Sequence, residues 1–263
     1  MTTPPETFDD HIAAWKQLQG EPWMRLRYRV GQANLARHLP TGPLQVLDIG
    51  GGNGADALPL AAQGHHVTVA DYSAAMLAEA RHAADDAGLA DQVATIHAAL
   101  ADLPAQLGPA RFDLILCHNV VQYLDDAAGA LRILRGLLRA SGVLSLITAN
   151  PVSEVLRAAL IQADPAAALA ALTAPVARTV VFDVDVHRYD LAELRGWLEA
   201  AGLTVVAHYG IRCVNDYLAD NARKADPAFA APLEALELAL SGRDPYRQIA
   251  RFTHLVARLG DQP

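Results

Sequence analysis

The sequence has little from which a disulfide framework or a metal site could be built. Its 263 residues include only two cysteines, Cys117 and Cys213, which lie far apart and form no C-x-x-C pair. Isolated thiols of this kind are typical of a reduced, cytoplasmic setting. The ten histidines are scattered, and the adjacent pair His65-His66 lacks the spacing of metal ligands, so we expect no metal site.

Long apolar runs and an excess of positive charge are also missing. No apolar run reaches the roughly 20 residues that span a bilayer, and we find no signal peptide, so we expect a cytoplasmic protein without a membrane partner. Lys and Arg total 21 against 29 Asp and Glu, which gives a net charge of −8. This balance argues against a surface built mainly to hold nucleic acid, although it leaves room for a local basic groove.

Apolar residues are abundant and follow a regular order along the chain. They make up 52% of the sequence, which is ample for one large core. Short apolar segments alternate with helical ones, and this order predicts parallel strands in a doubly wound sheet. The expected strands cover 44–49, 66–70, 93–97, 112–118, 143–148, 203–212 and 249–259. We therefore predict one α/β domain, 1–263, with a mostly parallel, seven-stranded, Rossmann-like sheet and a helical cap.

The remaining segments are expected to be helices and additions around the sheet. Core helices are predicted over 55–63, 73–87, 127–139 and 190–201. Residues 1–40 are expected to form an N-terminal lid, with two helical pieces in 6–39 broken near Gly20. The pattern changes after Asn150-Pro151, where we expect a cap insertion, 150–189, with a helix over 153–172 and an edge strand over 180–186. A second, polar helical insertion is expected at 214–241.

The most informative segment runs from Val46 to Gly54, where an apolar strand ends in Asp48 and glycines follow at 50, 51, 52 and 54. Glycines at a strand-to-helix turn let the backbone approach a ligand closely. The helix that follows points its N-terminal N–H groups at the same place. Such a turn predicts a site for a nucleotide-type cofactor.

Two cofactors compete for this turn. Residues 50–55 satisfy G-x-G-x-x-G/A, the dinucleotide pattern of NAD-dependent oxidoreductases. Asp48, however, would repel the pyrophosphate of a dinucleotide, whereas S-adenosylmethionine (SAM) carries an ammonium and a sulfonium and no phosphate. The segment Asp48 to Gly54 also resembles motif I, D-x-G-x-G-x-G, of the class I SAM-dependent methyltransferases. We therefore favour SAM and keep the NAD-dependent oxidoreductase as the alternative of another class.

Further candidate cofactor residues follow the other predicted strands, because ligands of such sheets bind outside the carboxyl ends of the strands. Asp71, with Tyr72 beside it, follows the second strand and can accept hydrogen bonds from ribose hydroxyls. Asp102 follows the third strand and is expected near the adenine amino group. His118-Asn119 ends the fourth strand, near the reacting methyl group. The Asn-Pro-Pro-Tyr signature of amino-group methyltransferases is absent there, which argues against base N-methylation.

A closer resemblance extends over most of the chain. The segments that carry it, in order, are Phe8-Asp9-Asp10, 47–54, Gly64-His65, 113–118, 142–146, Gly210-Ile211-Arg212, Asp216-Tyr217-Leu218, Pro245-Tyr246, Arg251-Phe252, His254 and Ala257-Arg258. In these segments the sequence resembles the tRNA 5-carboxymethoxyuridine methyltransferase family, whose members methylate a carboxylate on a wobble uridine with SAM.

The resemblance implies roles for several residues. Arg27 would approach the SAM carboxylate, Gly50, Gly51 and Gly52 would form the turn, and Asp71 would hold the ribose. His118 would line the methionine end and the reaction site. Arg212 would pair with the substrate carboxylate through two parallel hydrogen bonds, with Tyr217 near it as a further catalytic candidate. A carboxylate is already a competent nucleophile at neutral pH, so no catalytic base is expected.

One departure from the family bears on the substrate. The family's insertion carries a lysine-rich run suited to tRNA phosphates, whereas residues 174–185 contain one arginine and two aspartates. Arg25 and Arg29 share a helix face and could form a residual basic patch. We therefore expect methyl transfer to a carboxylate or nearby oxygen of a small acidic metabolite, with tRNA as the alternative acceptor. The sequence does not indicate an oligomeric state.

Overall fold

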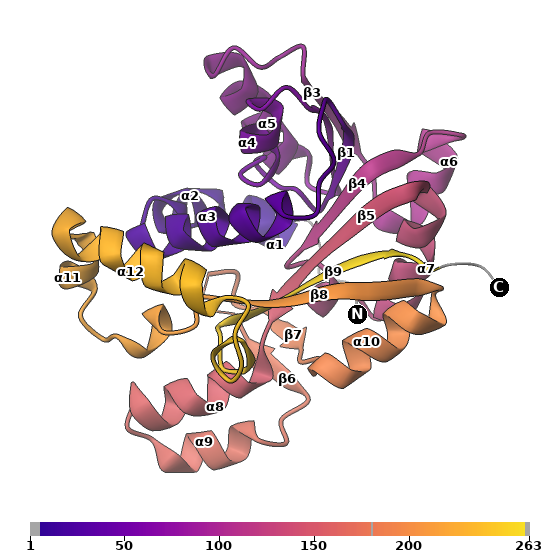
Figure 1. Ribbon diagram of the computed structural model, residues 1–263. Coiled ribbons are helices and arrows are strands. Elements are labelled where there is room, and N and C mark those ends of the chain that lie inside the picture. Colours follow the sequence, from indigo (N-terminus) through magenta and orange to yellow (C-terminus); the bar gives the residue numbers. More distant parts are fainter. Residues whose placement is uncertain (1–5, 180, 261–263) are drawn as a thin grey trace.

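A seven-stranded sheet forms the centre of the molecule (Figure 1). The computed structural model describes residues 6–179 and 181–260. The strand order is β3-β2-β1-β4-β5-β9-β8, and β9 is antiparallel to both of its neighbours while β1 to β5 pair in parallel. The strands are β1 (Gln45–Ile49), β2 (His66–Asp71), β3 (Val93–His97), β4 (Phe112–His118), β5 (Leu138–Ala149), β8 (Leu203–Ile211) and β9 (Phe252–Leu259). The predicted mostly parallel, doubly wound sheet is confirmed.

Both faces of the sheet are covered, which explains why its central strands are continuous apolar runs. Neighbouring residues of β1 enter different cores, since Leu47 packs with one set of helices and Val46 with another. The first core holds α7 (Ala127–Leu137) and α10 (Leu191–Ala200), with the short α6 (Leu103–Leu107) at its edge. The opposite core holds α3 (Pro22–Ala36), α4 (Ala57–Ala61) and α5 (Ala74–Asp86). The result is a three-layer α/β arrangement.

Helix starts in the core follow ordinary capping chemistry. Ser73 Oγ accepts from the N–H of Met76 at the start of α5, and Asp126 caps α7. Asp190 and Glu193 form a capping box at the start of α10. No helix in the described ranges is long and apolar enough to cross a membrane.

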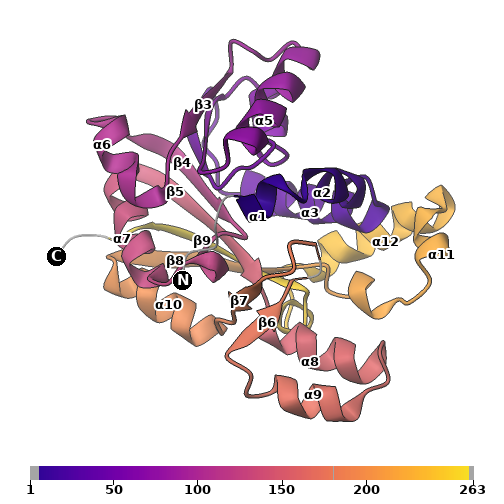
Figure 2. The same cartoon turned by 180° about the vertical axis from the view of Figure 1, so that it is seen from behind.

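Three additions surround the ends of the parallel strands (Figure 2). The first comprises the N-terminal helices α1 (Glu6–Asp9), α2 (Ile12–Gln19) and α3. The second is the cap segment, residues 150–189, with α8 (Pro151–Leu160), α9 (Pro165–Ala171), β6 (Val176–Arg178) and β7 (Asp185–His187). The third carries α11 (Asn221–Ala225) and α12 (Pro227–Leu240), and its Leu233 packs on Leu26 and Val30 of α3.

The cap segment differs from the prediction in two places. The expected single helix over 153–172 is two helices, because Ala163 has a φ of 52°, outside the helical range, and Asp164 with Pro165 starts a new helix. The expected edge strand over 180–186 is confirmed only at its end, in β7, and its first residue lies outside the described residues. Instead, β6 and β7 pair with each other as a separate antiparallel hairpin. Arg178 joins the two sides of that hairpin through Asp183 and Asp185.

A buried carboxylate fixes the loop that follows β8. Glu237 of α12 is fully buried and accepts hydrogen bonds from the backbone N–H groups of Cys213, Val214 and Asn215 at 2.5, 2.9 and 2.7 Å. These three groups point into the protein and have no strand partner. The carboxylate therefore holds in place the loop that carries Arg212 and its neighbours.

We predict that Glu237→Ala lowers the free energy of unfolding by about 3 kcal/mol, because three buried N–H groups lose their acceptor. Urea unfolding followed by circular dichroism measures the change. The matched control is Glu199→Ala, an exposed glutamate of α10, which should change stability by less than about 0.5 kcal/mol. Equal effects of the two substitutions would contradict this role of Glu237.

Candidate active site

A large cavity lies where the carboxyl ends of β1, β2 and β4 meet the three additions. Its volume is about 1350 Å³, above the roughly 300–1,000 Å³ that is usual for a single small ligand. The wall contains the glycine turn, the residues after β2 and β4, the N-terminal helices, the cap segment and the ends of β8 and β9. There is therefore room for a cofactor and an acceptor side by side.

The glycine turn is shaped by close contacts that only glycine permits. Gly50 has a φ of +59°, and a Cβ there would lie 2.6 Å from Cγ2 of Val120. A Cβ on Gly51 would lie 2.7 Å from the carboxyl carbon of Asp48. Gly52 has a φ of +53° with open space around its Cα. The turn thus lets the backbone itself form this part of the cavity wall.

Asp48 places a buried carboxylate under the turn. It is 1% exposed, lines the cavity, and its Oδ2 has no hydrogen-bond partner within the described residues. Burial and the nearby carboxylate of Asp56 raise its pKa well above the usual range, while Arg27 opposes the shift. A buried carboxylate with a free oxygen favours a cationic ligand, because such a ligand would supply the missing partner.

Asp71 stands at the end of β2 and is 7% exposed. Its two carboxylate oxygens accept from the N–H groups of Gly52 at 2.9 Å and Ser73 at 2.8 Å. A carboxylate has about four acceptor sites, so it can accept further hydrogen bonds, and the side chain lines the cavity. Tyr72 lines the cavity beside it. Asp71 can therefore both hold the turn and accept hydrogen bonds from a ligand.

Arg27, Asp56 and His118 form a buried charged cluster. Arg27 is 3% exposed and donates to Asp56 at 2.5 Å, while Nδ1 of His118 lies 3.3 Å from the other oxygen of Asp56. Burial alone would raise the pKa of Asp56, but Arg27 and then His118 bring it below the usual range. The other ring nitrogen of His118 contacts Ser145 Oγ at 2.8 Å, which in turn contacts His254 at 2.9 Å.

This cluster determines the charge of His118. Burial lowers the pKa of His118, although Asp56 opposes the shift, and burial lowers the pKa of His254 further. The imidazole of His118 is therefore neutral near pH 7, with Nε2 in contact with Ser145 and Nδ1 near the carboxylate of Asp56. It can shape the cavity wall but is poorly suited to act as a mobile base.

The N-terminal helices are tied to the turn and to the cap segment. Gln19 of α2 exchanges two hydrogen bonds with Asn53 of the turn, at 2.6 and 3.2 Å. The ring of Phe8 lies 4.7 Å from that of Phe182 and 5.6 Å from that of Tyr72, measured between centroids. These contacts place α1 and α2 along one side of the cavity.

Two predicted site residues lie elsewhere. Asp102 is exposed and does not line the cavity, because the wall after β3 is formed by Leu100, Ala101 and Leu103. Tyr217 does not line the cavity either. Its hydroxyl donates to the carbonyl of Ile249, and burial raises its pKa to about 12. We therefore remove Asp102 from the candidate cofactor site and Tyr217 from the catalytic residues.

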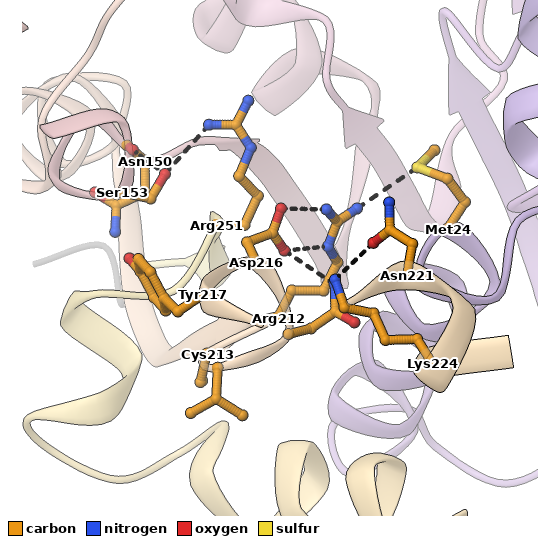
Figure 3. A network of polar contacts seen from close by, with 12 residues as sticks. Met24, Asn150, Ser153, Arg212, Cys213, Asp216, Tyr217, Asn221, Lys224 and Arg251 are labelled. Atoms are coloured by element: carbon orange, nitrogen blue, oxygen red, sulfur yellow. Dashed lines mark hydrogen bonds and ion pairs between the residues drawn. The ribbon is translucent and has the colours of Figure 1, made fainter. Parts of the chain in front are cut away.

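Arg212 lines the cavity, but its guanidinium is already paired. Nε donates to Asp216 at 2.6 Å and Nη2 donates to the other oxygen of the same carboxylate (Figure 3). The side chain is buried between Met24 and Phe252. An incoming carboxylate would have to compete with Asp216 for Arg212.

Sequence reasoning missed two groups of the cavity wall. Asp56 directly precedes α4, the helix after the glycine turn. Its place just after the motif that begins at Asp48 was a sign that it belongs to the site. Arg157 lies in an alanine-rich stretch of the cap segment, where no motif distinguishes it from a surface arginine. Both become evident only when distant segments are brought together.

Comparison with known proteins agrees with the geometry of the turn and the sheet. A family model described as a methyltransferase domain matches residues 47–144. A tRNA 5-carboxymethoxyuridine methyltransferase of Escherichia coli K12 is 33% identical over 255 residues, which cover 95% of each chain. The chain belongs to the class I SAM-dependent methyltransferases, in the family of that enzyme. SAM is therefore the cofactor, and the dinucleotide alternative is set aside.

Solved structures show the same fold at low sequence identity. The CcbJ methyltransferase of Streptomyces caelestis has a TM-score of 0.61 at 18% identity, covering 89% of each chain. A 1,6-didemethyltoxoflavin N1-methyltransferase of Burkholderia thailandensis, solved with S-adenosylhomocysteine, has a TM-score of 0.60 at 18% identity. It matches 97% of this chain and 86% of its own. The predicted class I fold is confirmed.

The two aspartates after β2 and β3 provide a matched test of the cofactor end. We predict that Asp71→Asn weakens binding of S-adenosylhomocysteine by about 10- to 100-fold, since charge-assisted hydrogen bonds are lost. Asp102→Asn should leave the affinity unchanged, because that side chain is outside the cavity. Titration calorimetry measures both. A loss in Asp102→Asn as large as that in Asp71→Asn would restore the original prediction.

Proposed function

We propose that this methyltransferase acts on a carboxylate, and that its acceptor is the wobble 5-carboxymethoxyuridine of tRNA. The observation that carries the proposal is the charge along the cavity. The cavity runs from the buried carboxylate of Asp48, suited to a cation, to a wall with Arg157, Arg212 and Arg251, suited to an anion. The relative of nearly equal length named above supports the tRNA nucleoside as the source of that carboxylate.

The residues at the turn fit SAM. The unpartnered oxygen of Asp48 would accept from the ammonium, directly or through water. Gly50 and Gly51 would leave room for the methionine portion, and Asp71 would accept from the ribose hydroxyls. Arg27 would face the SAM carboxylate while Asp56 holds its guanidinium in place. When bound, SAM supplies an electrophilic methyl group.

The acceptor needs orientation more than activation. A carboxylate is ionised and nucleophilic at neutral pH, so the protein has to align it in line with the methyl group and exclude water. His118 and Asn119 line the cavity, and Nε2 of the neutral His118 ring contacts Ser145 Oγ at 2.8 Å. The buried His118 is poorly suited to act as a mobile base, and the methylation of a carboxylate needs none.

A small acidic metabolite is the second candidate acceptor, and the surface charge favours it. The chain has a net charge of −8, and Arg178 of the cap hairpin is paired with Asp183 and Asp185. Phosphate contacts supply much of the affinity of most tRNA-binding proteins. The exposed Arg25 and the largely exposed Arg29, which pairs with Glu234, are the cations of α3 that could supply them.

The test is methyl transfer from radiolabelled SAM. We expect label in an anticodon stem-loop that carries 5-carboxymethoxyuridine, released by mild base as an ester should be, and none in the same stem-loop with uridine. Binding of the stem-loop should weaken with salt, and further in Arg25→Ala with Arg29→Ala. Label that reaches only small carboxylic acids would replace this proposal with the second candidate.

The buried Asp48 gives cofactor binding a pH dependence. Its raised pKa means that the folded protein takes up a proton there as the pH falls, whereas a cationic ligand binds the ionised form. We predict that affinity for S-adenosylhomocysteine falls as the pH is lowered into the acidic range, with proton release on binding at the lower pH. Calorimetry in buffers of different ionisation enthalpy measures both.

Asp48→Asn is the matched variant for this measurement. It should bind the ligand more weakly at the upper end of the range and lose most of the pH dependence. The carboxylates of Asp56 and Asp71 remain in that variant. A pH dependence that persists unchanged in Asp48→Asn would assign it to one of these two groups instead.

A further inference from the structure

Three arginines meet at the end of the cavity away from the glycine turn. Arg212 follows β8, Arg251 precedes β9, and Arg157 comes from α8 of the cap segment. Figure 3 shows Arg212 and Arg251 on either side of Asp216. We call these three residues the arginine cluster. Its members differ in what they are already bound to.

Two members of the cluster are committed to carboxylates. Arg212 donates two parallel hydrogen bonds to Asp216, and both side chains are under 10% exposed. Arg251 donates to Glu154 and to Ser153 Oγ, the latter at 3.3 Å. Because Glu154 and Ser153 belong to α8, the Arg251 contacts also fasten that helix to the main sheet. Each of these two cations has its own counterion.

Arg157 has none. Among the described residues of the cavity wall, it is the arginine whose guanidinium makes no hydrogen bond or ion pair, and its Nε is buried without a partner. It lies three residues after Glu154, so the two side chains share one face of α8. A buried N–H of a charged group that lacks an acceptor is costly, which indicates that an acceptor is supplied from outside the chain.

The charges around Arg157 also indicate that an acceptor from outside the chain binds there. Three guanidinium groups face two carboxylates, Asp216 and Glu154, so one positive charge is left over. Lys224, mostly buried behind Asp216, adds another. Burial and the neighbouring Arg251 lower the pKa of Arg157, while Asp216 and Glu154 oppose the shift. An anion bound at this wall would offset the cost of burying the charge of Arg157 and would reduce its repulsion by Arg251.

We infer that Arg157, rather than Arg212, binds the carboxylate of the methyl acceptor. The inference rests on the proposed function and assigns its specificity to a cap-segment residue. The two terminal Nη groups of Arg157 provide the planar fork that fits a carboxylate. Arg212 and Arg251 are positioning residues. Arg212 holds Asp216 in the cavity wall, and Arg251 holds α8, which carries Arg157. The cap segment thereby selects acceptors by their negative charge.

The experiment compares variants of Arg157 with a control arginine outside the cavity. Arg157→Gln should lower kcat/KM for the 5-carboxymethoxyuridine stem-loop by about 10- to 100-fold. Its affinity for S-adenosylhomocysteine should stay unchanged. Arg157→Lys should recover only part of the loss, because an ammonium lacks the fork. The control, Arg139→Gln, removes an exposed arginine that is paired with Asp113 and does not line the cavity, and should have no effect.

A carboxamide analogue of the stem-loop separates this role from a structural one. The wild-type protein should bind the carboxylate form about 10- to 100-fold more tightly than the amide, and Arg157→Gln should bind both alike. If the variant keeps the preference for the carboxylate, Arg157 is not the anchor. If the wild-type protein methylates no carboxylate-bearing acceptor, the proposed function itself fails. Unchanged unfolding in urea excludes a general loss of structure in the variant.

Discussion

The buried ion pair between Arg27 and Asp56 is the contact on which the site depends. Arg27 belongs to the N-terminal helices and Asp56 to the end of the glycine turn, so the pair joins these helices to the sheet. Breaking it would leave one buried charge alone, which is strongly unfavourable. The same carboxylate lies 3.3 Å from Nδ1 of His118, and its negative charge adds to burial in raising the pKa of Asp48. One ion pair thus links the position of the N-terminal helices, the surroundings of His118 and the charge of the turn.

A consequence of this arrangement is a graded charge along the cavity. The cofactor end holds Asp48 and Asp71 with only one arginine, itself neutralised by Asp56. The acceptor end holds more guanidinium than carboxylate. The cationic cofactor would bind at the end with the carboxylates, and the anionic acceptor at the end with the guanidinium groups. When both are bound, their opposite charges would lie close to one another. Charge complementarity of this kind orients both reactants before any chemistry occurs.

The parts that could be predicted from the sequence depend on local patterns. The seven strands were predicted because each is a short apolar run followed by a turn, and the glycines at 50–54 identify their turn through backbone conformations that few other residues adopt. Asp102 and Tyr217 were misplaced because position after a strand or within a motif does not say which way a side chain points. Beside Asp102, a neighbouring leucine faces the cavity instead, and the hydroxyl of Tyr217 donates to a backbone carbonyl.

Arg212 shows the limit of motif reasoning most clearly. A motif identifies a residue that a family needs, but it does not distinguish a residue that touches the ligand from one that holds its neighbours. Asp216, only four residues away, satisfies the fork of Arg212 within the loop that Glu237 secures. The uncommitted guanidinium belongs instead to a helix nearly sixty residues earlier in the chain. Since the cap segment lies outside the sheet and the glycine turn, a specificity residue there can change together with the acceptor while the cofactor end stays the same.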